Sequence, residues 1–363
     1  MENIKVTVYL STYNQEEYLR EAIDSILMQK CNFRYELLIA DDCSTDGTQS
    51  IAMEYKEKHP EIITTYFTPE NVGGCKKLTN CIDMGLFRGE YLAYLEGDDY
   101  WLDENRLQLL VDFLDENPEY SRVSHKRKVI DENGEFKGYD IADDVLNKKF
   151  TIEDFLAGKN YSDFGSVFRN YFREAGDKYH PILQASRNVC DFQDMFITQD
   201  FGPVYVMDKC FGVYRSRSIA GASNYNSIMS TERRCIDKIH IAKTVEKFYG
   251  GKYTLTPRIR IEQKVLFEQA VMLCSEEKLN IAKKLTDEKT QLELLAENLY
   301  LAGRGKKKDR ICFIKKHLTK KQKAELPFVM LRFVLNRIYK KIKHLPYEDK
   351  RRGYINPKFG EEI

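Results

Sequence analysis

The chain has 363 residues, of which 42% are hydrophobic, and a formal net charge of +1 at pH 7. These values are those of a globular protein with room for one large domain or two to three small ones. The nine cysteines are odd in number, widely spread and without a CxxC pair, which argues against a disulfide framework and a structural zinc site. Neither a basic-then-apolar leader nor a run of about 18 apolar residues is present, so we expect no secretion, no membrane span and a cytoplasmic location.

Strand and helix patterns alternate over the first hundred residues. Runs of β-branched, aromatic and apolar residues predict four strands, over residues 4–10, 35–40, 62–67 and 91–95. Apolar residues at helical spacing predict three intervening helices, over residues 16–28, 48–58 and 76–87. This alternation implies a largely parallel sheet covered on both faces, with ligands beyond the carboxyl ends of the strands.

The pattern becomes less regular after residue 102. We expect helices over 102–117, 150–158 and 191–199, a hairpin turn within 128–137, and one or two strands over 204–214. These strands would complete the sheet with mixed directions. Only helical periods follow from residue 227 to 345, which places a domain boundary at 222–227.

An acidic segment, Glu96-Gly97-Asp98-Asp99, directly follows the fourth predicted strand. Closely spaced carboxylates at a strand end suit a hard divalent cation, because magnesium and manganese use one or two carboxylates and fill the rest of the shell with water and phosphate. Gly97 would allow ligand and backbone to approach closely. The alternative is a solvated acidic loop that caps the next helix at Asp103.

A second acidic pair, Asp41-Asp42, ends the second predicted strand. The following residues 44–46 (Ser-Thr-Asp) are expected to cap the helix that starts near Gly47. Capping leaves the two preceding carboxylates unexplained. A buried aspartate that accepts a hydrogen bond from a nucleobase N–H is one use for such a group.

Four ordered segments together resemble a known family. They are Val6–Asn14 (VTVYLSTYN), Ile39–Thr48 (IADDCSTDGT), Asn71–Gly74 (NVGG) and Glu96–Trp101 (EGDDYW). In order and spacing they resemble the family 2 inverting glycosyltransferases of the GT-A fold, of the type used in bacterial polysaccharide and glycan biosynthesis. The resemblance extends over about residues 4–217 and is strongest in the first hundred.

The resemblance implies a fold and a division into domains. The fold would be α/β of the GT-A type, a Rossmann-like, mostly parallel sheet with helices on both faces, followed by an all-helical C-terminal region. The catalytic domain would span residues 1–225, with a nucleotide-binding half at 1–101 and an acceptor-binding half at 102–225. Residues 226–363 would form the helical domain, ending in a basic amphipathic tail.

The resemblance also implies roles for residues of the first half. Thr12 and Tyr13 would border the donor nucleotide, and Asp42 would read its base ring. Asp98 and Asp99 would form the metal motif for Mn²⁺ or Mg²⁺. Asp99 would be the direct metal ligand, and Asp98 the partner of the ribose or of a metal-bound water.

In the second half, Asp191 matches the family's catalytic base. An inverting transfer needs a carboxylate opposite the leaving diphosphate to take the proton of the attacking hydroxyl. Two alternatives stay open: Asp194, one helical turn further on, could be the base, or Asp191 could only cap its helix. Arg215 and Arg217 stand where the family often has a histidine, and Arg215 would contact the donor diphosphate.

Trp101, the single tryptophan, either lines an acceptor pocket by stacking on a sugar or anchors its loop in the core. His125 and His180 lack a spaced partner, and such histidines are ordinarily surface or core residues.

The function expected is an inverting hexosyl- or N-acetylhexosaminyl-transferase that moves a sugar from a nucleoside-diphosphate sugar, with UDP as the nucleotide, to a glycan or lipid-linked acceptor. A catalytically inactive sugar-nucleotide or glycan-binding scaffold is an alternative. A sugar-phosphate nucleotidyltransferase is a third class, but it needs a glycine-rich phosphate loop after the first strand, and Ser11–Glu17 contains no glycine.

The tail is strongly basic. Residues 304–352 hold 18 Lys and Arg against 4 Asp and Glu, a net charge of +14 that leaves −13 for the rest of the chain. Residues 326–345 predict an apolar helix, too short and too basic to span a bilayer but suited to lie in its anionic interface. The alternative is a helix packed on the catalytic domain with a solvated basic face. No nucleic acid partner is expected, because no nucleic-acid-binding fold accompanies the charge.

Overall fold

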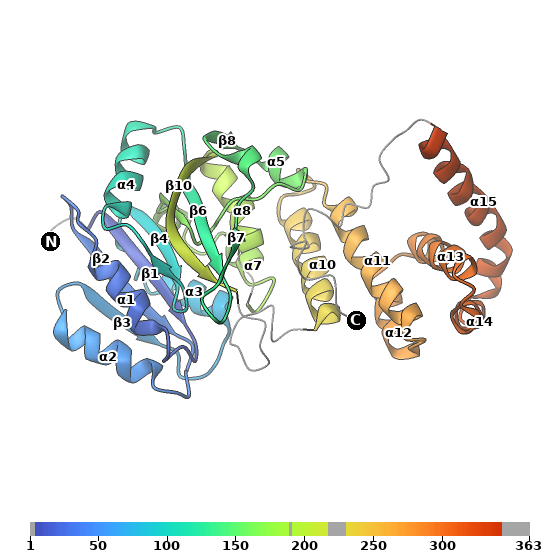
Figure 1. Ribbon diagram of the computed structural model, residues 1–363, viewed down its shortest axis with the longest axis horizontal. Coiled ribbons are helices and arrows are strands. Elements are labelled where there is room, and N and C mark those ends of the chain that lie inside the picture. The colour runs from blue at the N-terminus through green and yellow to red at the C-terminus, as the bar shows by residue number, and fades with distance from the viewer. Residues whose placement is uncertain (1–3, 189–190, 217–229, 343–363) are drawn as a thin grey trace. The chain divides into compact units, whose positions relative to one another are not determined.

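The computed structural model describes residues 4–188, 191–216 and 230–342 (Figure 1). The chain divides into two compact units, Met1–Ser230 and Thr231–Ile363. The boundary predicted at 222–227 lies outside the described residues, and so do the last residues of the predicted tail helix.

A ten-stranded mixed sheet forms the centre of the first unit, in the order β3-β2-β1-β4-β9-β6-β10-β5, with β7 paired to β6 and β8 to β10. The strands are β1 Val6–Thr12, β2 Tyr35–Asp41, β3 Ile63–Phe67, β4 Tyr91–Glu96, β5 Tyr100–Trp101, β6 Arg122–Ile130, β7 Phe136–Tyr139, β8 Lys148–Phe150, β9 Ser166–Arg169 and β10 Val204–Arg215. The first four strands run parallel to one another, and β10 runs parallel to β6. The turn between β6 and β7 is the hairpin that the sequence predicts.

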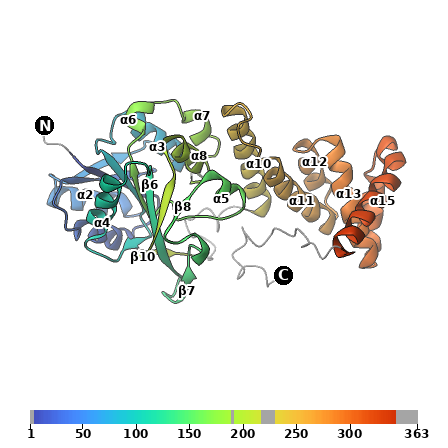
Figure 2. The ribbon, with the colours of Figure 1, turned by 90° about the horizontal axis from the view of Figure 1, so that it is seen from above.

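Helices cover this sheet (Figures 1 and 2). They are α1 Leu19–Leu27, α2 Thr48–Lys58, α3 Gly74–Asp83, α4 Arg106–Glu116, η1 Asp143–Val145, α5 Ile152–Leu156, α6 Phe172–Ala175, α7 His180–Leu183 and α8 Asp191–Phe201. Alternate residues of β1 are buried on opposite faces. Leu10 joins a core cluster with Ile23 of α1, whereas the Tyr9 ring packs edge-on against Phe87 and Tyr94. Burial on both faces is typical of a parallel sheet between helices and explains the nearly continuous apolar run of β1.

Strand β9 was not among the predicted strands. It is antiparallel to both neighbours and lies between β4 and β6, so it reverses the strand direction in the middle of the sheet. Four residues are too few to show a period, and three of the four are buried, so the segment lacks the alternation of a half-exposed strand. The fold class is nevertheless the predicted one, an α/β unit with a sheet covered by helices, followed by an all-helical region.

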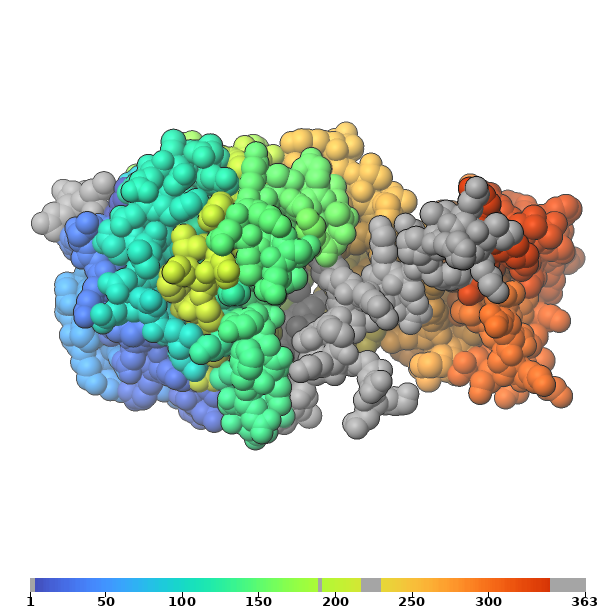
Figure 3. Space-filling model, turned by 45° about the horizontal axis from the view of Figure 1, so that its top comes forward, coloured from blue at the N-terminus to red at the C-terminus, as the bar shows by residue number. Residues whose placement is uncertain are grey.

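Strand β10 is irregular in its middle. Its register against β6 shifts between Met207 and Cys210 and again between Cys210 and Gly212. Asp208 and Lys209 are exposed there, and the yellow-green atoms of this segment reach the surface in Figure 3. A bulge of this kind bends a strand and re-aims its end. After it, β10 pairs regularly with β6 as far as Arg215.

The second unit is helical throughout its described residues. Its helices are α10 Thr231–Phe248, α11 Thr256–Met272, α12 Glu276–Lys284, α13 Glu288–Arg304, α14 Lys308–Lys316 and α15 Lys320–Ile342. Two of them begin at capping residues, because Ser275 accepts from the Lys278 N–H and Asp287 from the Thr290 N–H. No helix within the described ranges is both long enough and apolar enough to cross a membrane.

Candidate active site

Three polar segments that the sequence marks as functional meet at one edge of the sheet. In the parallel registers, Thr12 of β1 lies opposite Asp41 of β2, and Ser11 lies opposite Glu96 of β4. The loops that follow these strands carry Asp42 and Asp98. Because this edge is where ligands bind in parallel α/β sheets, the fold brings the predicted nucleotide and metal residues together.

The two aspartates at the end of β2, Asp41 within the strand and Asp42 directly after it, fix the loops around them. Asp41 is fully buried and accepts from the backbone N–H and hydroxyl of Ser44 and from Gln49 Nε2 at 2.6 Å. Asp42 accepts from the backbone N–H groups of Val72 and Gly73 at 2.9 and 2.8 Å. The carboxylate predicted to read the base therefore also holds the NVGG loop beside it.

A lysine that the sequence did not single out lies beneath this edge. Lys77 of α3 is 2% exposed, and its Nζ donates to Ser11 Oγ at 3.2 Å and to the carbonyl oxygens of Thr12 and Ala40 at 3.0 Å each. Burial lowers the pKa of this amine, and the carboxylates of Glu96, Asp42 and Asp41 oppose that shift. Lys77 thus ties β1 to β2 and places a positive charge under the acidic edge.

The space around Gly97 contains buried polar atoms without partners. Thr12 Oγ1 and Gln15 Oε1 are buried and make no hydrogen bond. A Cβ atom at Gly97 would lie 2.5 Å from Gln15 Oε1 and 3.0 Å from Thr12 Oγ1, so a side chain at this position would displace the end of the Gln15 side chain and crowd Thr12. Because an unpaired buried polar atom is costly, its presence points to a partner supplied by solvent or ligand.

Asp99 is held by protein groups on both sides. Its Oδ2 accepts from Arg127 Nη1 at 2.8 Å, and its Oδ1 accepts from the backbone N–H of Arg215 at 2.9 Å. Burial raises the pKa of this carboxyl well above its ordinary value, against the opposing charge of Arg127. The side chain of Arg215 donates from Nη1 to the Asp98 carbonyl oxygen at 2.6 Å and forms an ion pair with Glu21. Asp99 and Arg215 therefore shape the loop on which Asp98 sits.

Glu96 and Asp98 form a like-charged pair. Burial and the neighbouring charge of Asp98 raise the pKa of Glu96 to about 7, although Lys77 and the Ser11 hydroxyl lower it. Two carboxylates that repel each other in a buried loop are stabilised by a cation between or beside them.

The residues present fit a divalent cation. Glu96 and Asp98 supply hard oxygen atoms, and the unpaired Thr12 Oγ1 and Gln15 Oε1 lie beside the glycine that separates them. In the part of the chain that the structure describes, no three metal-ligating side chains already surround one point. Water and a diphosphate would complete the shell, as is usual for Mg²⁺.

Asp191, the predicted base, is the exposed first residue of α8. Its Oδ1 accepts from the backbone N–H of Phe192 at 3.0 Å. Burial raises the pKa of Tyr214 to about 12, and the charges of Asp99, Asp98 and Asp191 contribute to that rise. The Tyr214 hydroxyl therefore lies within electrostatic range of the acidic loop and of the start of α8.

Asp194, the alternative base, is bound inside the protein. It is 3% exposed, pairs with Arg122 and accepts from the Tyr171 hydroxyl. Arg122 also pairs with Asp163. Both carboxylate oxygens of Asp194 are therefore engaged by buried side chains of the protein, so this carboxylate is not presented to an acceptor.

Several other predicted residues have clear positions. Tyr13 is half-buried next to Thr12. Trp101 is 3% exposed in the core cluster, and the guanidinium of Arg106 lies 4.0 Å from its ring centroid, so Trp101 anchors its strand. His125 is fully buried and accepts from Arg106 Nε at 2.9 Å. Arg217 lies outside the described residues.

Residues 7–179 match the family model "Glycosyl transferase family 2". These residues are therefore a domain of that family, as the four ordered motifs predict.

Curated relatives are similar over about a third of the chain. An uncharacterised protein of Mycobacterium tuberculosis is 42% identical over 123 residues, which are 34% of this chain and 35% of that protein. The putative teichuronic acid biosynthesis glycosyltransferase TuaG of Bacillus subtilis is 33% identical over 109 residues, 30% of this chain and 41% of TuaG. The match thus spans between a third and a half of the length of these relatives.

Among solved structures, S. aureus TarS 1–349 in complex with UDP-GlcNAc superimposes with a TM-score of 0.49 and 18% identity, over 81% of this chain and 80% of that chain.

Proposed function

We propose that the chain is an inverting glycosyltransferase that moves a hexosyl or N-acetylhexosaminyl group from a UDP-sugar to a hydroxyl of a glycan or lipid-linked acceptor. The family match and the similarity to TuaG, a putative teichuronic acid biosynthesis glycosyltransferase, support the reaction class. The single observation that carries the proposal is the pair of unpartnered buried atoms, Thr12 Oγ1 and Gln15 Oε1, beside Gly97 in the acidic loop.

The donor is proposed to bind along the edge formed by β1, β2 and β4. Thr12 and Tyr13 would border the nucleotide. Asp42 would contact the base through the hydrogen-bonding capacity that remains after its carboxylate accepts from Thr68 Oγ1 and from the backbone N–H groups of Val72 and Gly73. Arg215, whose side chain already contacts the acidic loop, would lie near the diphosphate.

Asp98 is proposed as the carboxylate that contacts Mn²⁺ or Mg²⁺. Although the family pattern favours Asp99 as the direct ligand, both Asp99 oxygens accept hydrogen bonds from the protein. Asp99 would then act chiefly by positioning Asp98. When bound, the cation offsets negative charge on the leaving diphosphate.

Asp191 is proposed as the base. As the acceptor oxygen forms its bond to the anomeric carbon, the bond from that carbon to the diphosphate breaks and the hydroxyl proton passes to Asp191. The exposed position of Asp191 suits contact with an acceptor from solvent, whereas Asp194 is buried and paired with Arg122.

A thermal-shift screen of nucleoside-diphosphate sugars with Mn²⁺ tests the proposal. The expected result is that one UDP-sugar raises the melting temperature and that a chelator abolishes the shift, because a ligand that binds only the folded state stabilises it. A response to a nucleoside triphosphate with a sugar 1-phosphate instead would favour a nucleotidyltransferase. Binding of the UDP-sugar without turnover on any acceptor pool would favour an inactive scaffold.

A further inference from the structure

Helix α15 carries apolar side chains on two different sides. One side packs against α13, where the ring of Phe333 contacts Tyr300 at a centroid distance of 5.5 Å and Arg337 lies over the Tyr300 ring. This contact explains why part of the helix is apolar. It does not explain why the opposite side of α15 is also apolar.

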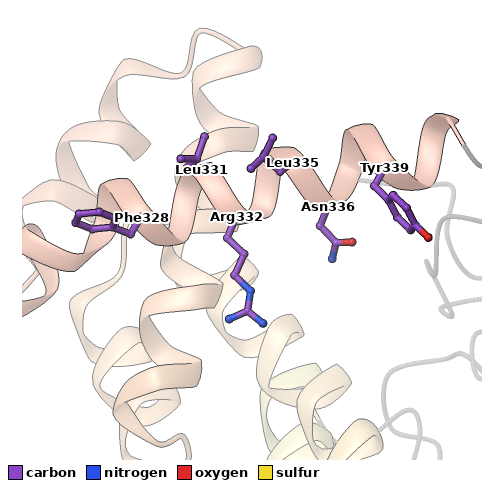
Figure 4. A pocket seen from close by; sticks show the side chains of 6 residues that line it. All are labelled: Phe328, Leu331, Arg332, Leu335, Asn336 and Tyr339. Atoms are coloured by element: carbon purple, nitrogen blue, oxygen red, sulfur yellow. The ribbon is translucent and has the colours of Figure 1, made fainter.

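The side of α15 away from this contact exposes large apolar residues. We call it the outer face, and it consists of Phe328, Leu331, Leu335, Ile338 and Tyr339. Phe328 is 76% exposed and Leu331 is 59% exposed. Figure 4 shows Leu331 and Leu335 projecting from the same side of the helix. Spacings of three and four residues place these side chains on one stripe.

Within the second unit, the described residues leave the outer face uncovered. A surface hollow there is lined by side chains of α15 alone, four of them from the outer face together with Arg332 and Asn336 (Figure 4). A helix that is apolar on all sides normally has all of them buried. We therefore expect a binding partner to cover the outer face.

The charge of α15 identifies the kind of occupant. Residues 326–342 contain Arg332, Arg337, Lys340 and Lys341 and no acidic residue. A second copy of the same helix would bring like charges together, which is unfavourable. A surface of anionic lipid offers negative charge beside apolar chains, and both match the helix.

We propose that the outer face of α15 inserts into the headgroup region of an anionic membrane, with the helix lying parallel to the surface. From Phe328 to Tyr339 the stripe is about 17 Å long at 1.5 Å per residue. Arg332, at the edge of the hollow, reaches lipid phosphates while the leucines and Phe328 contact acyl chains. The apolar and basic contributions act together, as stable interfacial binding requires two signals.

Flotation of the full chain with vesicles tests this proposal without any donor or acceptor, so its outcome is independent of the transferase reaction. We expect flotation with vesicles of equal parts phosphatidylcholine and phosphatidylglycerol, and much weaker flotation with phosphatidylcholine alone. High salt should weaken the first interaction, because it screens the charge attraction.

Paired substitutions locate the binding surface. Leu331→Gln with Leu335→Gln should reduce vesicle affinity roughly tenfold or more, because two exposed leucines no longer enter the apolar layer. Arg332→Gln should reduce binding to the anionic vesicles about fivefold. Leu273→Gln, at a leucine with the same 59% exposure outside α15, is the matched control and should bind like the wild type. All these side chains are exposed, so the variants should fold.

Three results would overturn the proposal. One is equal flotation of the double leucine variant and the Leu273→Gln control. Another is a dimer in the absence of vesicles that the double leucine variant converts to monomer, which would assign the outer face to a second copy. The third is loss of flotation on removing residues 343–363 while the double leucine variant still floats. Retained flotation of that truncated chain would support the proposal.

Discussion

The guanidinium of Arg127 donates to Asp99 at 2.8 Å and so joins the acidic loop after β4 to β6, two strands away in the sheet. Arg127 is itself fixed by Asp140, whose carboxylate accepts from Arg127 Nε at 2.8 Å and from its backbone N–H at 2.7 Å. The loop that is proposed to hold the cation is therefore braced by a buried ion-pair network.

Asp99→Asn and Asp98→Asn should have different effects. Asp99→Asn leaves Arg127 buried beside Asp140 alone and should lower the free energy of unfolding by about 3 kcal/mol. Asp98→Asn removes one of the two like charges of the pair with Glu96, so it should destabilise the protein less than Asp99→Asn does, and it should abolish metal-dependent donor binding. Urea unfolding and donor titration with Mn²⁺ measure the two effects. Equal destabilisation by both substitutions would contradict the assignment.

Lys77→Met should weaken donor binding and destabilise the protein. The substitution removes three hydrogen bonds at the ends of β1 and β2 and the positive charge beneath the acidic edge, so we expect a loss of about 2–3 kcal/mol in unfolding free energy. Lys76→Met changes an exposed neighbour and should have no such effect. If the two variants unfold at the same urea concentration and bind donor alike, Lys77 does not support the site.

Gly97→Ala should block the site without unfolding the protein. The added methyl group would meet Gln15 Oε1 and Thr12 Oγ1, where we place the donor or its bound cation. Isothermal titration should show a loss of donor affinity of at least about tenfold. Gly303→Ala is the control, since nothing lies within 4 Å of a Cβ at that position of α13. Undiminished donor affinity in Gly97→Ala would place the donor elsewhere.

The sequence alone predicts most of the polar residues at the carboxyl ends of β1, β2 and β4, but it does not predict the buried lysine, Lys77, that holds these strand ends together. Thr12, Asp42 and Asp98 can be identified from the sequence because each stands at the end of an apolar run that predicts a strand. The role of Lys77 cannot be predicted from the sequence, since a lysine on a helix is ordinarily exposed. Its burial depends on carboxylates and carbonyls from three strands that come together only in the folded sheet.

Side-chain pairing that depends on the folded structure also limits what the sequence predicts about the proposed catalytic base. Asp191 and Asp194 are one helical turn apart in the sequence and look equivalent there. Only the fold pairs Asp194 with Arg122, a residue 72 positions earlier in the chain, and leaves Asp191 exposed. The short strand β9 was missed for a related reason, because its place depends on pairing with β4 and β6.

His125 should make stability depend on pH between about 5 and 6.5. Burial and the charge of Arg106 lower the pKa of His125 well below its ordinary value. The unfolded chain takes up a proton below about pH 6.5 and the folded chain does not, so this residue lowers stability as the pH falls and has no such effect above that pH.

His125→Gln isolates this contribution. At pH 8 the variant should be less stable than the wild type, because Arg106 loses its acceptor. The difference should narrow by up to about 1.4 kcal/mol per pH unit below pH 6.5. Chemical unfolding of both proteins from pH 8 to 5 gives the difference directly, and a gap that stays constant would show that His125 is not held neutral.

The most direct test of the central claim is release of nucleoside diphosphate from a UDP-sugar in the presence of Mn²⁺ and an acceptor pool. The wild type should release UDP, a chelator should stop the release, and Asp191→Asn should slow it by roughly 10²–10⁴-fold while donor affinity stays unchanged. Turnover of Asp191→Asn at the wild-type rate would contradict the assignment of the base, and absence of release from every UDP-sugar would contradict the assignment of the enzyme.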